Sequence, residues 1–232
     1  MDRVIGVQRS GARKSGGGPG VETWRAFSFG GDYDVENLSF GVLTACNEER
    51  LDPRAGFEAH AHRDVEIVTW VIEGHLTHQD ASGGTHTLGP GRLQRLTAGS
   101  GVRHVERNDS ESEPLRFLQM WLHPATFGGE PRYEATDEPA PVSTGLRRLA
   151  SPFRQPEATL YVGRPPQADR TELPAAPYLY VHVVHGTVRL NSVRLGPGDA
   201  ARISDEAGGV TAETDGAAEY LVWEMHAVPA YG

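Results

Sequence analysis

The sequence is poor in cysteine, since Cys46 is the only one among 232 residues. A disulfide needs two cysteines, and a thiolate metal site needs several, so neither can be built within one chain. Any metal that this chain binds must therefore be held by nitrogen and oxygen ligands.

Lysine is equally scarce, because Lys14 is the only one, and the formal net charge is −9. Proteins that bind nucleic-acid backbones need a basic face that displaces counterions. The acidic balance therefore argues against a nucleic-acid partner.

Long apolar runs are missing as well, and the first twenty residues are polar with several basic side chains. A membrane span needs about 20 consecutive apolar residues, and a secretion signal needs a shorter apolar core. We therefore expect no membrane partner and a cytoplasmic location.

Helical periodicity is hard to find. From Phe27 onward, short apolar runs are separated by Gly, Pro, Asn and Asp, which is typical of an all-β sandwich or barrel. The clearest strands are predicted at Val65–Glu73 and Arg116–Leu122. A hairpin is predicted from His75–Asp80 to Thr85–Leu88, because glycines precede the second strand.

The glycine-rich residues 11–20 predict a mobile loop or arm. Between Pro124 and Pro156 the apolar density falls while Pro, Gly and Glu accumulate, which indicates a connection between two domains. We place the domains at residues 1–130 and 131–232. Strands of the second domain are predicted at Thr159–Val162, Pro177–Val184, Thr187–Leu190, Val193–Leu195, Val210–Glu213 and Glu219–His226.

The two halves share a motif. In the first half a strand ends at WVIEG and a hairpin leads to LGPG; in the second half a strand ends at HVVHG and a hairpin leads to LGPGD. A repeated strand and hairpin of this kind predicts a duplicated barrel.

Two pairs of residues could hold a metal. His60 and His62 are two apart, which puts both on one face of a strand, and His104 and Glu106 have the same spacing. If the pairs lie on facing strands of a small barrel, four side chains converge. Such a set suits Fe, Mn, Co, Ni, Cu or Zn, and an octahedral ion would keep two positions open for substrate and dioxygen. Oxygenase chemistry needs a redox-active ion, which favours iron over zinc.

The remaining histidines lack a paired partner. His182 lies in a predicted buried strand with Tyr180 two residues before it, so we expect the second domain to be metal-free. Glu66 shares the parity of the first histidine pair. Surface or structural roles are predicted for His75, His78, His86, His123, His185 and His226.

The chain resembles a known family over nearly its whole length. The run from Gly56 to Pro124, GFEAHAHRDVEIVTWVIEGHLTHQD and then GPGRLQRLTAGSGVRHVERNDSESEPLRFLQMWLHP, resembles the pirin family, in particular its short bacterial members similar to quercetin 2,3-dioxygenase. The upstream FSFGGDYDVENLSFGVLTACNEERLDPRAGF and the downstream YLYVHVVHGTVRLNSVRLGPGDAARI extend the resemblance. It implies an all-β fold with two cupin (jelly-roll) β-barrel domains in tandem and one metal ion in the first.

Carried over from the family's H-P-H and H-x-E segments, the implied metal ligands are His60, His62, His104 and Glu106. The broader cupin pattern H-x-H-x3-E would instead make Glu66 the carboxylate ligand. The resemblance to pirins selects Glu106 and leaves Glu66 as a buried acceptor that orients a histidine ring. Ala61 stands where the family usually has proline, which removes a backbone constraint.

The resemblance implies an iron-dependent dioxygenase that opens the central ring of a flavonol such as quercetin and releases carbon monoxide. Glu106 is the predicted catalytic residue, because it would take the proton of the flavonol 3-hydroxyl as well as bind the metal. The metal ion is the only cofactor expected. Candidates for the pocket wall are Val68, Trp70, Ile72, Gln119 and Trp121, and ordinary barrel core is the alternative for the first three.

Two other functions stay open at this point. The first is a regulatory protein whose metal state controls binding to a protein partner, either an enzyme or a transcription factor. The second is an oxygenase that acts on another enol or phenol. An open apolar pocket would favour the enzyme, and a closed site beside an exposed apolar patch would favour the regulator.

Overall fold

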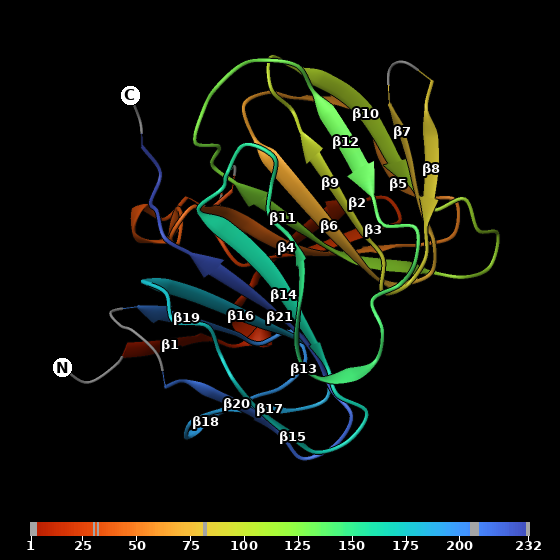
Figure 1. The fold of residues 1–232 in the computed structure, drawn as a ribbon. Helices are drawn as coiled ribbons and strands as arrows, with labels where there is room; N and C mark the ends of the chain where they lie inside the picture. The colour runs from red at the N-terminus through yellow and green to blue at the C-terminus, as the bar shows by residue number, and fades with distance from the viewer. Residues whose placement is uncertain (1–3, 30, 32, 81–82, 205–208, 231–232) are drawn as a thin grey trace.

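The computed structural model describes residues 4–29, 31, 33–80, 83–204 and 209–230. Figure 1 shows two lobes built from β-strands. The helical elements among these residues are two short 3-10 turns, η1 (Ser10–Ala12) and η2 (Val35–Asn37). The prediction of an all-β fold is confirmed. In this described part of the chain, no helix is long and apolar enough to cross a membrane.

The first lobe consists of a seven-stranded sheet, in the order β12-β9-β6-β11-β4-β3-β2, and a four-stranded sheet, in the order β5-β10-β7-β8. Its strands are β2 (Lys14–Gly18), β3 (Val21–Arg25), β4 (Leu43–Leu51), β5 (Gly56–His62), β6 (Glu66–Glu73), β7 (Leu76–Asp80), β8 (Thr85–Leu88), β9 (Leu93–Thr97), β10 (Val102–Arg107), β11 (Leu115–Leu122) and β12 (Arg132–Ala135). The predicted hairpin is confirmed as β7 paired with β8, although residues 81–82 of its turn lie outside the described residues.

The second lobe consists of a six-stranded sheet, in the order β1-β19-β16-β21-β14-β13, and a four-stranded sheet, in the order β15-β20-β17-β18. Its strands are β1 (Val4–Gln8), β13 (Ser143–Ala150), β14 (Ala158–Arg164), β15 (Asp169–Glu172), β16 (Tyr178–His185), β17 (Val188–Leu190), β18 (Val193–Leu195), β19 (Ala200–Ser204), β20 (Thr211–Thr214) and β21 (Glu219–Met225).

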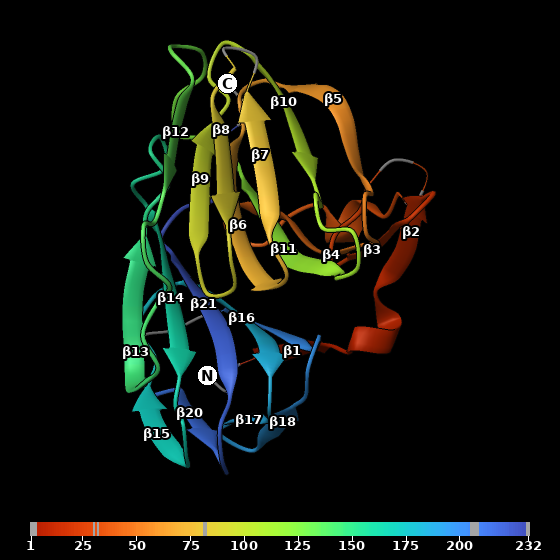
Figure 2. The same cartoon turned by 90° about the vertical axis from the view of Figure 1, so that its right-hand side faces the viewer.

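The two lobes share the order of four strands in the large sheet and of all four strands in the small sheet. The run β4-β11-β6-β9 in the first large sheet is repeated as β14-β21-β16-β19, and β5-β10-β7-β8 is repeated as β15-β20-β17-β18. Figure 2 shows the two lobes one above the other. The predicted duplication is therefore confirmed by topology, which is stronger evidence than the short shared motif.

The ends of the large sheets are occupied differently. β12 pairs with β9, while the equivalent position beside β19 is taken by β1, from the opposite end of the chain. The division of the domains at residue 130 stays a prediction. Strand β12 lies after this residue and pairs with β9 before it, and β1 lies before it and pairs with β19 after it. Residues 14–18 were predicted to lie in a loop, which is wrong, because they form the edge strand β2 against β3. Gly17 has a φ of 131°, and a Cβ there would lie 2.0 Å from the carbonyl oxygen of Val21, so this edge strand requires glycine.

The two large sheets pack against each other and bury a shared apolar core. From the first lobe this core takes side chains such as Val68, Trp70 and Met120, and from the second it takes Leu160 and Trp223. Strand β11 is buried on both faces, as its sequence predicted, because one face meets this core and the other faces the interior of its own lobe.

Glycine is required at the same turn in both lobes. Gly74 ends β6 with a φ of 73°, and a Cβ there would lie 2.3 Å from the carbonyl oxygen of Pro114. Gly186 ends β16 with a φ of 74°, and a Cβ there would lie 2.5 Å from the carbonyl oxygen of Ala217. At each turn a backbone carbonyl group leaves no room for a side chain. The repeated motif therefore has glycine at this position for a steric reason.

The substitution Gly74→Ala should lower the free energy of unfolding by about 2 kcal/mol or more, because it adds both strain and a backbone clash. Chemical denaturation measures this change. Gly196→Ala is the control, since a Cβ at that turn meets nothing within 4 Å. Equal stability of the two variants would contradict the steric explanation.

The interior of the first lobe contains a buried acid. Glu49 on β4 is 5% exposed and accepts a hydrogen bond from Thr23 on β3. Burial raises the pKa of Glu49 to about 8, although the bond from Thr23 lowers it. The folded state thus holds a proton on Glu49 that the unfolded chain releases above its ordinary pKa of 4.5.

Because the pKa is raised by folding, Glu49 contributes stability fully below pH 4.5, and that contribution is lost as the pH rises toward 8. The substitution Glu49→Gln should remove this loss, which we expect to be about 1–3 kcal/mol between pH 5 and pH 8. Urea midpoints across that range test it, with the exposed Glu172→Gln as control. An unchanged pH dependence in Glu49→Gln would contradict the assignment.

Candidate metal centre

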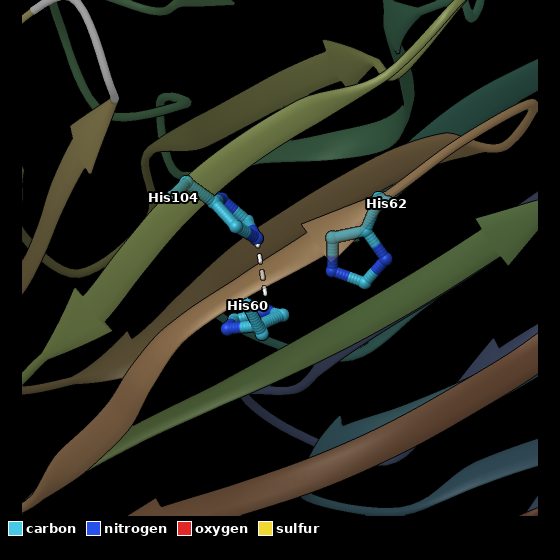
Figure 3. A group of neighbouring side chains, drawn as sticks. All are labelled: His60, His62 and His104. Atoms are coloured by element: carbon cyan, nitrogen blue, oxygen red, sulfur yellow. Dashed lines mark hydrogen bonds between the residues drawn. The ribbon is translucent and has the colours of Figure 1, made fainter.

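Three of the four predicted ligands meet inside the first lobe. His60 and His62 lie on β5 and His104 lies on β10, and Figure 3 shows their rings pointing toward one another. We expected this convergence if the two strands faced each other in a small barrel. They are hydrogen-bonded neighbours in the small sheet, and His104 stands directly opposite His60. Directly opposed side chains on neighbouring strands are about 5 Å apart, which is close enough to share an ion.

The orientation of His60 suits a ligand. Its Nδ1 lies 2.8 Å from the carbonyl oxygen of Glu58, so Nδ1–H donates and Nε2 keeps a free lone pair. That Nε2 lies 3.0 Å from Nε2 of His104. Two nitrogens bound to one ion at about 2.1 Å, at right angles, would lie about 3 Å apart.

A nitrogen of His62, which lies in the same group, has no partner. Nε2 of His62 is buried without a hydrogen-bond partner among the described residues. Burying a polar atom without a partner is costly, so such atoms are expected where a ligand completes them. The residues present therefore fit a metal ion.

Within the described part of the chain, potential ligand atoms that lie within 4.8 Å of one another form two groups that share His104. One group is His60, His62 and His104, and the other is His78, His104 and Glu106. The register between β10 and β5 shifts between His104 and Glu106, so Glu106 lies opposite Phe57 on one side and His78 on the other. The predicted four-ligand set stays a prediction.

Glu106 is held by two amides from the large sheet. Nε2 of Gln94 donates to one carboxylate oxygen at 2.8 Å, and Nε2 of Gln119 donates to the other at 2.7 Å. Tyr133 and Trp121 donate in turn to the side-chain oxygens of these glutamines. This chain of bonds fixes the carboxylate in place and explains why polar residues occur in the middle of a barrel.

The titration of these groups follows from burial. Burial raises the pKa of Glu106 to about 7, while the bonds from Gln119 and Gln94 lower it. Burial lowers the pKa of His104 to about 3 and that of His62 to about 4, and the neighbouring His60 lowers both further. The imidazoles of His104 and His62 are thus neutral near pH 7, and the neutral form is the one that binds metals.

Glu66 was predicted to orient a histidine ring, but its hydrogen bonds go to other residues. Its carboxylate accepts from Thr97 and from the backbone N–H of Arg154, and it lies on β6 of the large sheet. The parity argument failed because Asp64, between β5 and β6, has a φ of 52°, which breaks the alternation of faces.

The same break changes the predicted pocket wall. Val68 and Trp70 belong to the core between the lobes and Ile72 packs against it, so their alternative role as core is correct. Gln119 and Trp121 do lie at the site, through the bond to Glu106 and through Trp121, whose ring centroid is 5.2 Å from that of His62.

His78 was assigned a surface or structural role from its lack of a paired partner, yet it is fully buried beside His104. Its Nδ1 lies 3.4 Å from Nδ1 of His104. A local signal existed, because His78 shares the strand face of Leu76, two residues earlier, which is buried in the lobe interior.

A cavity of about 690 Å³ opens beside the histidines. His62 and His78 line it together with apolar side chains such as Val102 and Tyr133. This volume lies within the usual range for small-molecule sites, about 300–1,000 Å³.

In the second lobe, strands β15 and β20 take the places of β5 and β10. Their sequences are DRTE and TAET, with no histidine. His182 lies instead on β16 of the large sheet, buried, where burial lowers its pKa to about 4. The expectation of a metal-free second domain stays a prediction, with this sequence difference in its favour.

Comparison with known proteins gives matches over both lobes. Residues 7–122 match the family model for Pirin, and residues 155–225 match the one for the quercetinase C-terminal cupin domain. A Mycobacterium bovis protein provisionally named quercetin 2,3-dioxygenase is 36% identical over 239 residues, covering 98% of this chain and 97% of that protein. Quercetin 2,3-dioxygenase of Escherichia coli is 30% identical over 215 residues, covering 88% and 91%.

The crystal structure of the bacterial pirin YhhW from Escherichia coli in complex with nickel(II) superposes with a TM-score of 0.89 at 29% identity. The match covers 97% of this chain and 100% of that structure. With two cupin domains, a histidine-rich centre in the first of them and relatives that match over nearly its whole length, this chain belongs to the pirin family.

Proposed function

We propose that this chain is a metal-dependent dioxygenase that opens the ring of a flavonol, with iron as the working metal. The observation that supports it best is the convergence of His60, His62 and His104 beside a cavity of about 690 Å³. The names of its relatives in Mycobacterium bovis and Escherichia coli point to the same reaction.

In this proposal His60, His62, His104 and Glu106 hold the ion. A bound iron ion would supply Lewis acidity and redox exchange with dioxygen. Glu106 takes the proton of the substrate hydroxyl, and a pKa of about 7 suits a group that accepts and returns a proton near neutral pH. Gln94 and Gln119 keep its two oxygens aimed in fixed directions.

A regulatory role also has an observation in its favour. Phe29, Tyr33, Val35 and Leu38 are large apolar side chains that are 39–70% exposed. The ring of Phe29 contacts Trp121 at 5.9 Å between centroids, and Trp121 contacts His62. An exposed apolar segment that reaches the metal centre through one tryptophan is a candidate contact for a protein partner.

Loss of a ligand should remove the ion. We expect His60→Ala and His104→Ala to reduce bound iron from about one per chain to near zero, because too few ligands remain. Metal analysis after anaerobic loading measures this, with His185→Ala in the second lobe as control. His78→Ala should keep its iron. Loss of iron in His78→Ala would instead assign His78 to the ligand set.

Oxygen uptake with quercetin tests the reaction itself. The iron-loaded protein should consume oxygen and release carbon monoxide, and Glu106→Gln should slow uptake roughly 100-fold, since a general base contributes about that factor. Glu73→Gln, at the exposed end of β6, is the matched control. Absence of uptake with quercetin and related flavonols would move the assignment to the regulatory role.

A further inference from the structure

Both ring nitrogens of His104 make contacts. Its Nε2 lies 3.0 Å from Nε2 of His60, on the side where the three histidines converge (Figure 3). Its Nδ1 lies 3.4 Å from Nδ1 of His78, which is long for a hydrogen bond but is the one polar contact of that atom among the described residues. The two nitrogens lie on different edges of an imidazole, so His78 meets His104 on the side away from His60.

Metal binding fixes the positions of the protons on both rings. An ion bound at Nε2 of His104 leaves the proton of that ring on Nδ1, because a neutral imidazole carries one N–H. That N–H needs an acceptor, so Nδ1 of His78 accepts it and His78 holds its own proton on Nε2. Nε2 of His78 has no hydrogen-bond partner among the described residues, so no contact there opposes this tautomer.

The ring of His78 is well fixed. Its residue is fully buried and lies on β7 between two neighbouring strands, opposite His86 on β8 and Glu106 on β10. The ring stacks on Tyr133 with centroids 4.5 Å apart and an interplanar angle of 27°. His86 covers the other face of Tyr133 at 4.6 Å. A buried ring held in this way has few other positions, so its Nδ1 is a fixed acceptor.

Tyr133 also supports a second predicted ligand. Its hydroxyl donates to Oε1 of Gln94 at 3.1 Å, and Nε2 of Gln94 donates to Glu106 at 2.8 Å. One tyrosine on β12 therefore stacks on His78 behind His104 and bonds to the amide behind Glu106. The side chains behind the two ligands of β10 thus form one connected layer.

We propose that His78 is a positioning residue of the metal centre: its Nδ1 accepts the Nδ1–H of His104, fixes the orientation of that ring and makes its Nε2 a stronger ligand. Hydrogen bonds from metal-binding histidines to a buried acceptor commonly orient the ring and raise its basicity. This inference rests on the proposed function, because it takes His104 as a ligand. It gives His78 a role at the centre without making it a ligand.

Two substitutions at His78 separate the hydrogen bond from packing. In His78→Asn the side-chain Oδ1 takes the place of Nδ1 and can accept the same bond, whereas His78→Leu has no acceptor. Both variants lose the stacking on Tyr133, so a difference between them reports the bond. His86→Leu is the control, because it removes the ring from the other face of Tyr133 instead.

The affinity of the full chain for Fe(II) is measured with a competing chelator under anaerobic conditions, and the Fe(III)/Fe(II) midpoint potential is measured by spectroelectrochemistry. We expect His78→Leu to bind iron when the metal is in excess, but about 10- to 100-fold more weakly, as loss of such a partner usually causes. Its potential should rise, because a weaker ligand stabilises the ferric ion less. His78→Asn should recover most of both changes, and His86→Leu should show neither.

Equal losses of affinity in His78→Leu and His78→Asn, or an unchanged potential in His78→Leu, would overturn the inference. If His78→Leu does not fold, His78→Ala takes its place in the same comparison. Neither measurement involves a flavonol, so this test is separate from that of the proposed reaction. If the variants behave as expected and no flavonol is oxidised, the role of His78 stands and the dioxygenase proposal falls.

Discussion

The centre of this protein depends on one cross-strand pair, His60 on β5 opposite His104 on β10. Their Nε2 atoms lie 3.0 Å apart because neighbouring antiparallel strands place directly opposed side chains close together. β10 also pairs with β7, which brings His78 to the other side of His104. One central strand of a four-stranded sheet thus gathers histidines from both of its neighbours.

The large sheet of the first lobe supplies the support behind this pair. Gln94 on β9 and Gln119 on β11 reach across the barrel and hold both oxygens of Glu106. Burial lowers the pKa of His104, which keeps its imidazole neutral, and raises the pKa of the Glu106 carboxyl to about 7. Metal binding and proton transfer both require these states, so the packing of the two sheets and the chemistry of the centre are linked.

The two lobes share a topology but differ in their histidines. The strands that carry the histidines in the first lobe carry none in the second. The large sheet of the second lobe covers the outer face of the first, where Trp70 donates a hydrogen bond to Glu219 at 2.8 Å. The second lobe therefore packs against the large sheet of the first lobe, in which the histidine-rich centre lies.

The sequence by itself determined the all-β class, the repeat and the identity of three converging histidines, because strand alternation and turn glycines are local properties that spacing reveals. Only the tertiary structure decided which strands are neighbours, and so brought His78 to the centre and placed Val68 and Trp70 between the lobes. Glu66 was wrongly placed on the face of His60 and His62 because we counted the alternation of faces through Asp64. This residue has a positive φ, which reverses the faces of the strand that follows. Strand pairing joins residues far apart in the chain, and alternation within one strand holds no information about its partner.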